Sequence, residues 1–241
     1  IYSIRQYSFQ IHDKLYTSLI FFNFKFMKLH VQKFTFNPFQ ENSYIIYADT
    51  KEAVIIDPGC YFAHERAELD DFIASKQLKV LALLGTHAHI DHVLGNDHVI
   101  NKYDCPYYLH EADLVILEMM SRSAEMYGFD AAIPSPHPTH SLEHGKMLEF
   151  GAIKLQVYHT PGHAPGHVVF YNADNNFVIN GDVLFAGSFG RVDLPGGDIN
   201  ILKNSINEVM FTLPEETVVY CGHGPETTIG KEKVSNYILQ Y

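Results

Sequence analysis

Apolar positions along this chain recur with two periods, which predict strands and helices in alternation. Successive side chains of a strand point to opposite faces, so alternation or a short apolar run is typical of a strand. Such segments predict strands at residues 28–36, 43–47, 53–56, 79–85, 107–109, 147–150, 153–158, 168–171, 177–179 and 217–220. Apolar residues three or four apart predict helices at residues 63–77, 92–103, 111–126, 199–211 and 230–239.

The order of these elements predicts an α/β fold. Strands and helices alternate in two rounds, and each round ends in turns rich in histidine and aspartate. A sheet and a helix each have an apolar face to bury, so we expect two packed sheets with helices outside. Residues 127–145 interrupt the pattern, because the prolines of residues 133–138 exclude a helix or a central strand. This segment is either a lid over a site or a plain surface loop.

The segment from His87 to His92 has the highest density of metal-ligand side chains, with three histidines and one aspartate. Imidazole nitrogen and carboxylate oxygen are the ligand atoms that zinc and similar divalent ions prefer. The segment follows the strand at 79–85, and alternate side chains of an extended chain share a face. His87 and His89 can therefore bind one ion. Asp91 and His92 lie where a helix begins, so they turn toward a second position nearby.

Three turns further along the chain supply more of the same ligand types. They are residues 159–167, 180–182 and 222–224, which contain His159, His163, His167, Asp182 and His223. Each turn follows a strand and contains glycine, which lets the backbone bend tightly beside a ligand. Ligands that come from the ends of separate strands form a rigid, open site, as a catalytic metal requires. Spacing alone does not decide among the three histidines of the first turn.

The order HxHxDH, TPGH, GD and GHG resembles the metallo-β-lactamase superfamily over most of the chain from about residue 28 onward. The segments DPG, TPGHAPGH, GDVLFAGSFGR and CGHGP are, more closely, similar to glyoxalase II-like hydrolases, also called hydroxyacylglutathione hydrolases, in their short bacterial form. The resemblance implies a four-layer αβ/βα sandwich. Two mixed sheets would pack together with helices outside, and the metals would lie at one edge of the sheets.

The resemblance also implies seven metal ligands. The first ion would be bound by His87, His89 and His163, the second by Asp91, His92 and His223, and Asp182 would bridge the two. His159 and His167 would then flank a ligand without binding metal. We expect two divalent ions, with zinc preferred and iron or manganese as alternatives.

Two further residues have two interpretations each. Asp57 resembles the family's outer carboxylate, which orients a ligand histidine through its other ring nitrogen; the alternative is that it caps its own turn. Arg191 could pair with a substrate carboxylate or with a nearby acid. Asp193 stands where the family has a tyrosine that contacts glutathione, so the thiol carrier remains open.

The implied reaction is hydrolysis of an acyl thioester such as S-D-lactoylglutathione. A hydroxide held by two metal ions would attack the acyl carbon, and Asp91 would orient it as a catalytic residue. A thiolate leaves without needing a proton, whereas an amide nitrogen would need a general acid. The alternative function is that of a persulfide dioxygenase, which shares the fold but uses one iron bound by two histidines and an aspartate. Asp91, His92 and His223 favour two ions.

Composition narrows the expected partners. The formal net charge is −11, whereas nucleic-acid binding requires a basic surface. We therefore expect no nucleic acid, and the partner that the resemblance implies is a small-molecule thioester substrate. The apolar run at residues 15–22 is shorter than the roughly 20 residues that span a bilayer, so we expect no membrane association. The sequence leaves the oligomeric state open.

Cysteine content and the first residues bear on compartment and boundaries. Cys60, Cys105 and Cys221 are too few for a disulfide framework and indicate reduced thiols in the cytoplasm. We read Cys221, close to His223, as a packing residue. Residues 1–26 come before Met27, and we expect them to precede the natural start. Residues 27–241 would then form one hydrolase domain.

Overall fold

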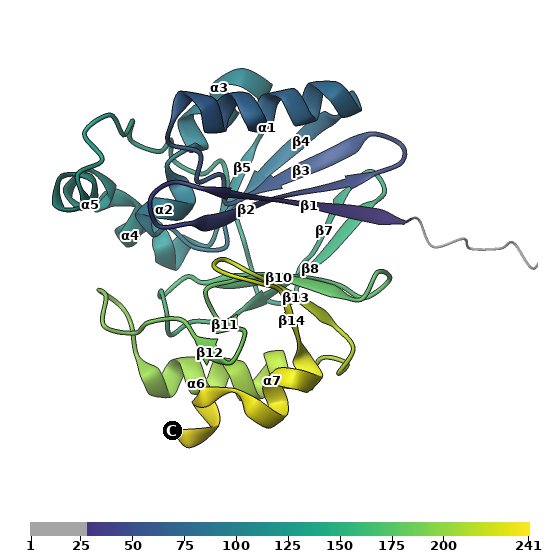
Figure 1. Ribbon diagram of the computed structural model, residues 1–241, viewed down its shortest axis with the longest axis vertical. Helices are drawn as coiled ribbons and strands as arrows, with labels where there is room; N and C mark the ends of the chain where they lie inside the picture. Colours follow the sequence, from purple (N-terminus) through teal and green to yellow (C-terminus); the bar gives the residue numbers. More distant parts are fainter. Residues whose placement is uncertain (1–27) are drawn as a thin grey trace, which may run out of the picture.

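The computed structural model describes residues 28–241, whose strands form two six-stranded sheets and a two-stranded hairpin (Figure 1). The segment 1–26, which we expect to precede the natural start, lies outside the described residues. No helix within residues 28–241 has the length and apolar character needed to cross a membrane.

The first sheet is mixed and has the strand order β1-β2-β3-β4-β5-β6. Its strands are β1 (Leu29–Phe36), β2 (Glu41–Ala48), β3 (Glu52–Ile56), β4 (Lys79–Leu84), β5 (Tyr107–Leu109) and β6 (His140–Ser141). The first three run antiparallel to one another, and β3 to β6 run parallel. The parallel strands end at the same edge, so the segment that follows β4 begins at that edge.

The second sheet is also mixed, in the order β14-β13-β10-β9-β8-β7. Its strands are β7 (Met147–Phe150), β8 (Ile153–His159), β9 (Val168–Asn172), β10 (Phe177–Gly181), β13 (Val218–Cys221) and β14 (Thr227–Thr228). Only β10 and β13 pair in parallel, so both deliver the residues that follow them to the same edge. The hairpin of β11 (Leu184–Phe185) and β12 (Ser188–Phe189) continues from β10.

Alternation along the strands decides which side chains fill the space between the sheets. Ile46 and Ile56 face the second sheet and share a cluster with Phe170. Ile45 points the other way and packs in a cluster with Leu69. Each fully buried side chain of this size contributes about 1.5–3 kcal/mol, so a one-residue slip of β2 would be costly.

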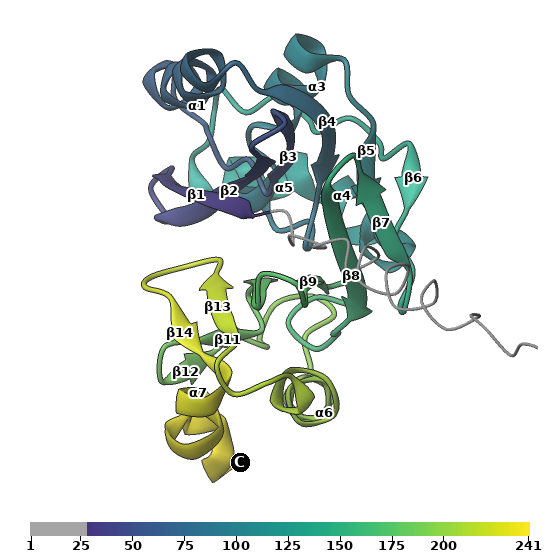
Figure 2. The same cartoon turned by 90° about the vertical axis from the view of Figure 1, so that its right-hand side faces the viewer.

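Helices cover the outer face of each sheet. The first sheet carries α1 (Ala63–Lys76) and α3 (Asn96–Tyr103), and the second carries α6 (Ile199–Glu208) and α7 (Ile229–Ser235), which Figure 2 shows at opposite ends of the molecule. The layers are helix, sheet, sheet and helix. The predicted four-layer αβ/βα sandwich with two mixed sheets is confirmed.

Two of the predicted helices are wrong as single elements. The segment 92–103 forms α2 (Ile90–Val93) and α3, separated at Gly95, where a Cβ would overlap Cys60 Sγ and the Pro58 carbonyl oxygen. Close packing of the chain against the turn after β3 therefore breaks the helix. The segment 111–126 divides into three elements: η1 (Glu111–Asp113), α4 (Leu114–Glu118) and α5 (Met120–Tyr127).

The structure also contains short elements that periodicity did not predict. Residues 127–145 include β6, which adds an edge strand to the first sheet and ties the proline-rich segment to it. The strands β6, β11, β12 and β14 have two residues each. A two-residue strand shows no alternation, so only tertiary pairing defines it. The last helix ends early and continues as η3 (Tyr237–Gln240), and α6 is followed by η2 (Met210–Thr212).

Candidate metal centre

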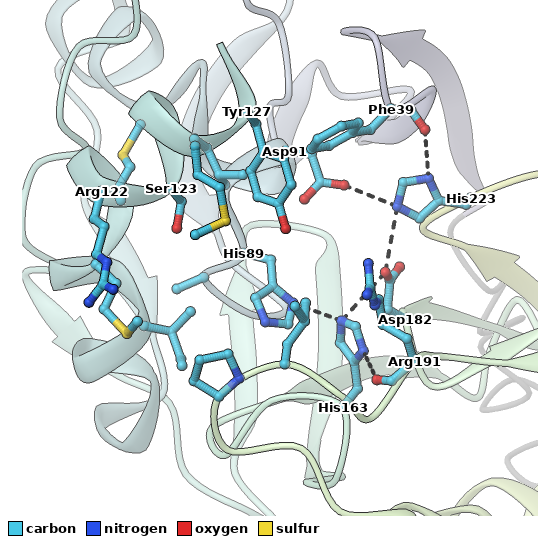
Figure 3. Close-up of a pocket in the computed structure, with 18 of the residues that line it drawn as sticks. Phe39, His89, Asp91, Arg122, Ser123, Tyr127, His163, Asp182, Arg191 and His223 are labelled. Carbon is cyan, nitrogen blue, oxygen red and sulfur yellow. Dashed lines mark hydrogen bonds and ion pairs between the residues drawn. The ribbon is translucent and has the colours of Figure 1, made fainter. Parts of the chain in front are cut away.

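All seven side chains proposed as metal ligands lie together at one edge of the two sheets. His87 and His89 follow β4, Asp91 and His92 lie in α2, and His163 lies in the loop between β8 and β9. The remaining two, Asp182 and His223, follow β10 and β13. Both sheets therefore contribute ligands, and Figure 3 shows five of them converging at one side of a cavity.

The first group consists of His87, His89 and His163, whose nitrogen atoms lie within 4.8 Å of one another. His163 Nε2 is 3.2 Å from His87 Nε2 and 2.8 Å from His89 Nδ1. Atoms that bind one zinc ion at about 2.0–2.2 Å in a tetrahedron lie roughly 3.4 Å apart. The three nitrogens are therefore close to the spacing that a single ion imposes.

The second group consists of Asp91, His92 and His223. Asp91 Oδ2 lies 3.1 Å from His223 Nε2 and 3.8 Å from His92 Nε2. Asp182 lies between the two groups. Its Oδ1 is 3.5 Å from His92 Nε2, and its Oδ2 is 3.5 Å from both His163 Nε2 and His223 Nε2. One carboxylate thus faces histidines of both groups.

Unpartnered buried atoms indicate that these residues fit metal ions. His92 Nε2 and Asp182 Oδ1 are buried, and neither makes a hydrogen bond within residues 28–241. A buried polar atom without a partner is costly, and a cation between the two would satisfy both. Gly222 keeps this space open, because a Cβ there would overlap Asp182 Oδ1. The donor set, five imidazoles and two carboxylates, suits zinc or iron.

Hydrogen bonds on the outer side of the imidazoles fix which nitrogen faces the centre. His163 Nδ1 donates to the carbonyl oxygen of Arg191 at 2.7 Å, and His223 Nδ1 donates to that of Phe39 at 3.2 Å. A carbonyl oxygen can only accept, so Nδ1 carries the proton in both rings. Nε2 is therefore the nitrogen available to a cation.

Asp57 acts on a ligand of each group. It accepts a hydrogen bond from His92 Nδ1 at 3.1 Å and, through the same Oδ2, one from the Thr86 hydroxyl at 2.5 Å. Thr86 Oγ1 in turn lies 3.0 Å from His87 Nδ1. Asp57 also has a φ of 48°, in the left-handed region, which turns its carboxylate toward the segment after β4. Its Oδ1 accepts from the Thr86 backbone N–H at 2.7 Å, so it binds that segment rather than its own turn.

The electrostatic environment favours the metal-binding forms of His87, His89 and Asp182 and opposes that of His92. Burial lowers the pKa of His89 to about 3 and that of His87 well below its usual value, so both rings are neutral. Burial alone would raise the pKa of Asp182, but the neighbouring His92 and His223 hold it well below its usual value. Burial would likewise lower the pKa of His92, and Asp182 and Asp91 outweigh it and raise that pKa. Metal binding would displace this proton.

The other histidines of the motif region lie outside the ligand groups. His167 is buried and accepts a hydrogen bond at Nε2 from the backbone N–H of Asp182 at 3.0 Å, so it positions that ligand. His159 Nε2 donates to the Pro165 carbonyl oxygen at 2.9 Å. Cys221 is a free, buried thiol in an apolar cluster, as are the other two cysteines.

Sequence reasoning missed two buried acids near the centre. Both oxygens of Asp113 accept backbone hydrogen bonds of 2.6 Å, one from Ala88 and one from Gly166. Asp113 therefore joins the loop of His87 and His89 to the loop of His163, and burial raises its pKa to about 6. Glu41 is fully buried 3.8 Å from His92 Nδ1, and burial raises its pKa well above the usual value. Neither acid stands in a ligand motif, so no local signal marks them.

A cavity of about 770 Å³ opens beside the ligands. His89, Asp91, His163, Asp182 and His223 form one side of it, and mostly apolar side chains form the rest. Arg191 also lines it, and its guanidinium makes two hydrogen bonds of 2.7 Å with the carboxylate of Asp193. Of the two interpretations of Arg191, this structure therefore shows the ion pair with a nearby acid.

Comparison with known sequences gives relatives along most of the chain. The family profile of the Metallo-beta-lactamase superfamily matches residues 36–223. The probable metallo-hydrolase YqgX of Bacillus subtilis is 39% identical over 204 residues, which cover 84% of this chain and 93% of that protein. The hydroxyacylglutathione hydrolase GloC of Haemophilus influenzae is 34% identical over 205 residues, or 83% of this chain and 93% of the relative.

Solved structures with a similar fold superpose on most of this chain. The BLEG-1 B3 metallo-beta-lactamase superposes with a TM-score of 0.80 at 39% identity, and the match covers 88% of this chain and 100% of that one. TTHA1623, solved in a di-iron-bound form, gives a TM-score of 0.77 at 41% identity, with 86% of this chain and 99% of that one covered.

Proposed function

The chain belongs to the metallo-beta-lactamase superfamily, and on that premise we propose that it is a hydrolase that uses two divalent ions to cleave a small-molecule acyl thioester. One observation carries the proposal. The carboxylate of Asp182 lies 3.5 Å from histidines of both ligand groups, through Oδ1 to His92 and through Oδ2 to His163 and His223. A carboxylate in this position can bridge two ions, which is the role that the family resemblance implies for it.

His87, His89 and His163 would bind one ion, and Asp91, His92 and His223 the other. Two ions bound there supply a water molecule whose pKa is lowered to about 7 and a positive charge for the substrate carbonyl oxygen. Asp91 lies at the wall of the cavity, where it would accept a hydrogen bond from the attacking water and orient it. Asp57 and Thr86 would keep the rings of His87 and His92 in place.

The reaction would consume one water molecule for each thioester. The water oxygen bonds to the acyl carbon, the carbon–sulfur bond breaks, and sulfur leaves with the bonding electron pair as a thiolate. Both water protons are released, and the second product is a carboxylate. No general acid is required, because a thiolate is stable without a proton. The likeness to a relative named hydroxyacylglutathione hydrolase supports a thioester over an amide.

Zinc is the metal that we propose, with iron or manganese as alternatives. The di-iron-bound form of TTHA1623, which is 41% identical, supports iron as the first alternative. All three cysteines are free and buried, which supports a reducing compartment, and we propose the cytoplasm.

Metal analysis and a substrate panel test the proposal together. Purified protein is analysed for metals and assayed with S-D-lactoylglutathione, other acyl thioesters, nitrocefin and glutathione persulfide. We expect two ions per chain, thiol release from thioesters, and activity at background in Asp182→Ala. Asp174→Ala removes an exposed carboxylate from the turn after β9 and should leave the activity unchanged.

Two results would overturn the proposal. One iron per chain with oxygen consumption on glutathione persulfide would identify the mononuclear dioxygenase. Hydrolysis of nitrocefin without thioester cleavage would instead indicate a β-lactamase, the activity in the name of the BLEG-1 neighbour.

A further inference from the structure

The side of the cavity opposite the metal ligands is built from flexible apolar side chains. We call Ile116, Met119, Met120 and Met126 the methionine wall. Phe185, Phe189 and Leu194 line the cavity from the segment after β10. Methionine adapts its shape to a bound apolar group, and a cavity of about 770 Å³ can hold a ligand much larger than a lactoyl group. The lining therefore favours a substrate with an apolar body.

Two arginines line this cavity, and they differ in what neutralises them. Arg191 forms a bidentate pair with Asp193, which balances its charge within its own loop. Among the ion pairs of residues 28–241, none includes Arg122, which lies on α5 beside the methionine wall. Figure 3 shows Arg122 at the end of the cavity away from Asp91 and His223. The cavity thus has the proposed metal ligands at one end and the unpaired guanidinium of Arg122 at the other.

We propose that the substrate is a thioester with an apolar body and an anionic group, and that this group pairs with Arg122. The inference rests on the proposed thioesterase function and specifies its substrate class. The reacting carbonyl would lie at the metal ligands, the apolar body along the methionine wall, and the anion at Arg122. The anion could belong to the acyl group or to the thiol, since either can extend from the reacting carbon.

The overall charge of the chain makes this local cation important. A protein with a formal net charge of −11 repels an anionic substrate at long range. A guanidinium at the cavity offsets that repulsion and selects for a carboxylate or phosphate by paired hydrogen bonds. Arg122 is exposed, so we expect the pair to contribute about twofold to fivefold in kcat/KM.

Two pairs of matched thioesters separate charge from shape. The first pair carries the anion on the acyl side: the 2-mercaptoethanol thioesters of glutarate and of pentanoate. The second carries it on the thiol side: the pentanoyl thioesters of 3-mercaptopropionate and of its neutral amide. Each is assayed with the zinc-loaded wild-type protein, Arg122→Gln, Arg122→Lys and Lys231→Gln. Lys231 is exposed on α7 away from the cavity, so its change controls for net charge.

We expect the wild-type protein to prefer the anionic member of at least one pair, which identifies the side that carries the charge. Arg122→Gln should raise KM for that member about twofold to fivefold, with kcat and the neutral member unchanged. Arg122→Lys should restore most of the preference, and Lys231→Gln should retain it. Unchanged melting temperatures would show that the variants fold.

The outcomes distinguish this inference from the function on which it rests. Cleavage of all four thioesters with the same anionic-to-neutral ratio in Arg122→Gln would overturn the role of Arg122 and leave the thioesterase intact. A wild-type preference for the neutral members would do the same. Cleavage of none by protein that holds two metal ions would overturn the proposed function itself, and this inference with it.

Discussion

The two sides of the cavity differ in how exposed their side chains are and in how firmly hydrogen bonds hold them. On the metal side, His87 and Asp182 are 0% and 7% exposed, and the ligand rings are fixed by hydrogen bonds to Asp57, Thr86 and backbone carbonyls. On the other side, Met126 is 67% exposed at the end of a short helix, and Arg122 is exposed beside it. The proposed metal ligands, which require fixed geometry, lie at one edge of the two sheets. The side chains that we propose to contact the substrate lie mainly on α4 and α5.

This difference in exposure predicts which properties a substitution on each side of the cavity should change. A buried ligand tolerates little displacement, because its neighbours fill the surrounding space and its hydrogen bonds have no substitutes. An exposed side chain on a short helix can be replaced at little cost in stability. Changes on the metal side should therefore affect metal binding, stability and all substrates alike, whereas changes at the exposed Arg122 and Met126 should affect only some substrates.

Metal removal tests the metal side most severely. Extensive dialysis against a chelator should lower kcat/KM for every substrate by at least about 10³-fold, because the attacking water loses its activation. Each ion present at about 100 times its Kd contributes roughly 2.7 kcal/mol, so loss of both should lower the melting temperature by about 10–20 °C. Readdition of zinc should restore both quantities. Full activity in protein that elemental analysis shows to be metal-free would contradict the metal centre.

Asp113 offers the largest single-residue test of stability. Asp113→Ala leaves the backbone N–H groups of Ala88 and Gly166 buried without their acceptor, at about 1–3 kcal/mol each. We expect the free energy of unfolding to fall by about 2–5 kcal/mol, measured by urea denaturation of the zinc-bound protein. Asp130→Ala removes an exposed carboxylate and should change it by less than about 0.5 kcal/mol. Equal effects of the two changes would show that Asp113 does not join the ligand loops.

Asp113 also shows what sequence reasoning could not reach. The ligand side chains could be proposed because they stand in short motifs, and the alternation of β1 and the short apolar run of β3 indicated strands. Asp113 stands in a stretch that reads as ordinary helix, and its partners are backbone groups 25 and 53 residues away. Every residue except proline has a backbone N–H, so the sequence does not show which acidic side chain will accept a hydrogen bond from a distant one.

The same limit applies to the helices that were predicted as continuous. The pattern of apolar residues in 92–103 and 111–126 is helical, but α2 ends where Gly95 packs against the turn after β3. The division of 111–126 places Asp113 under the ligand loops and Met119 at the cavity. In both segments, tertiary contacts over a few residues override the helical periodicity. Both breaks lie next to the candidate site.

Asp57 tests whether one carboxylate serves both ions. Asp57→Asn keeps a side chain that tolerates the φ of 48°, so it changes the charge and the hydrogen bonds with little backbone strain. We expect zinc affinity to fall about 10- to 100-fold at both positions, measured by competition with a chromophoric chelator. Thr86→Val removes the hydroxyl that joins Asp57 to His87 and keeps the hydrogen bond from His92 to Asp57, so it should weaken mainly the ion at His87, His89 and His163. Identical zinc affinity in Asp57→Asn and the wild-type protein would contradict this arrangement.

Met126 should give the smallest and most selective effect. Met126→Ala removes part of the methionine wall from an exposed position, so the free energy of unfolding should change by less than about 0.5 kcal/mol. The kcat/KM for octanoyl thioesters should fall roughly twofold to fivefold, because some methylene groups lose apolar contact, while acetyl thioesters should be unaffected. Met147→Ala, on β7 outside the cavity lining, provides the matched control and should change neither rate. An equal loss for acetyl and octanoyl substrates would mean that the wall acts on the metal side as well, and the contrast between the two sides would no longer hold.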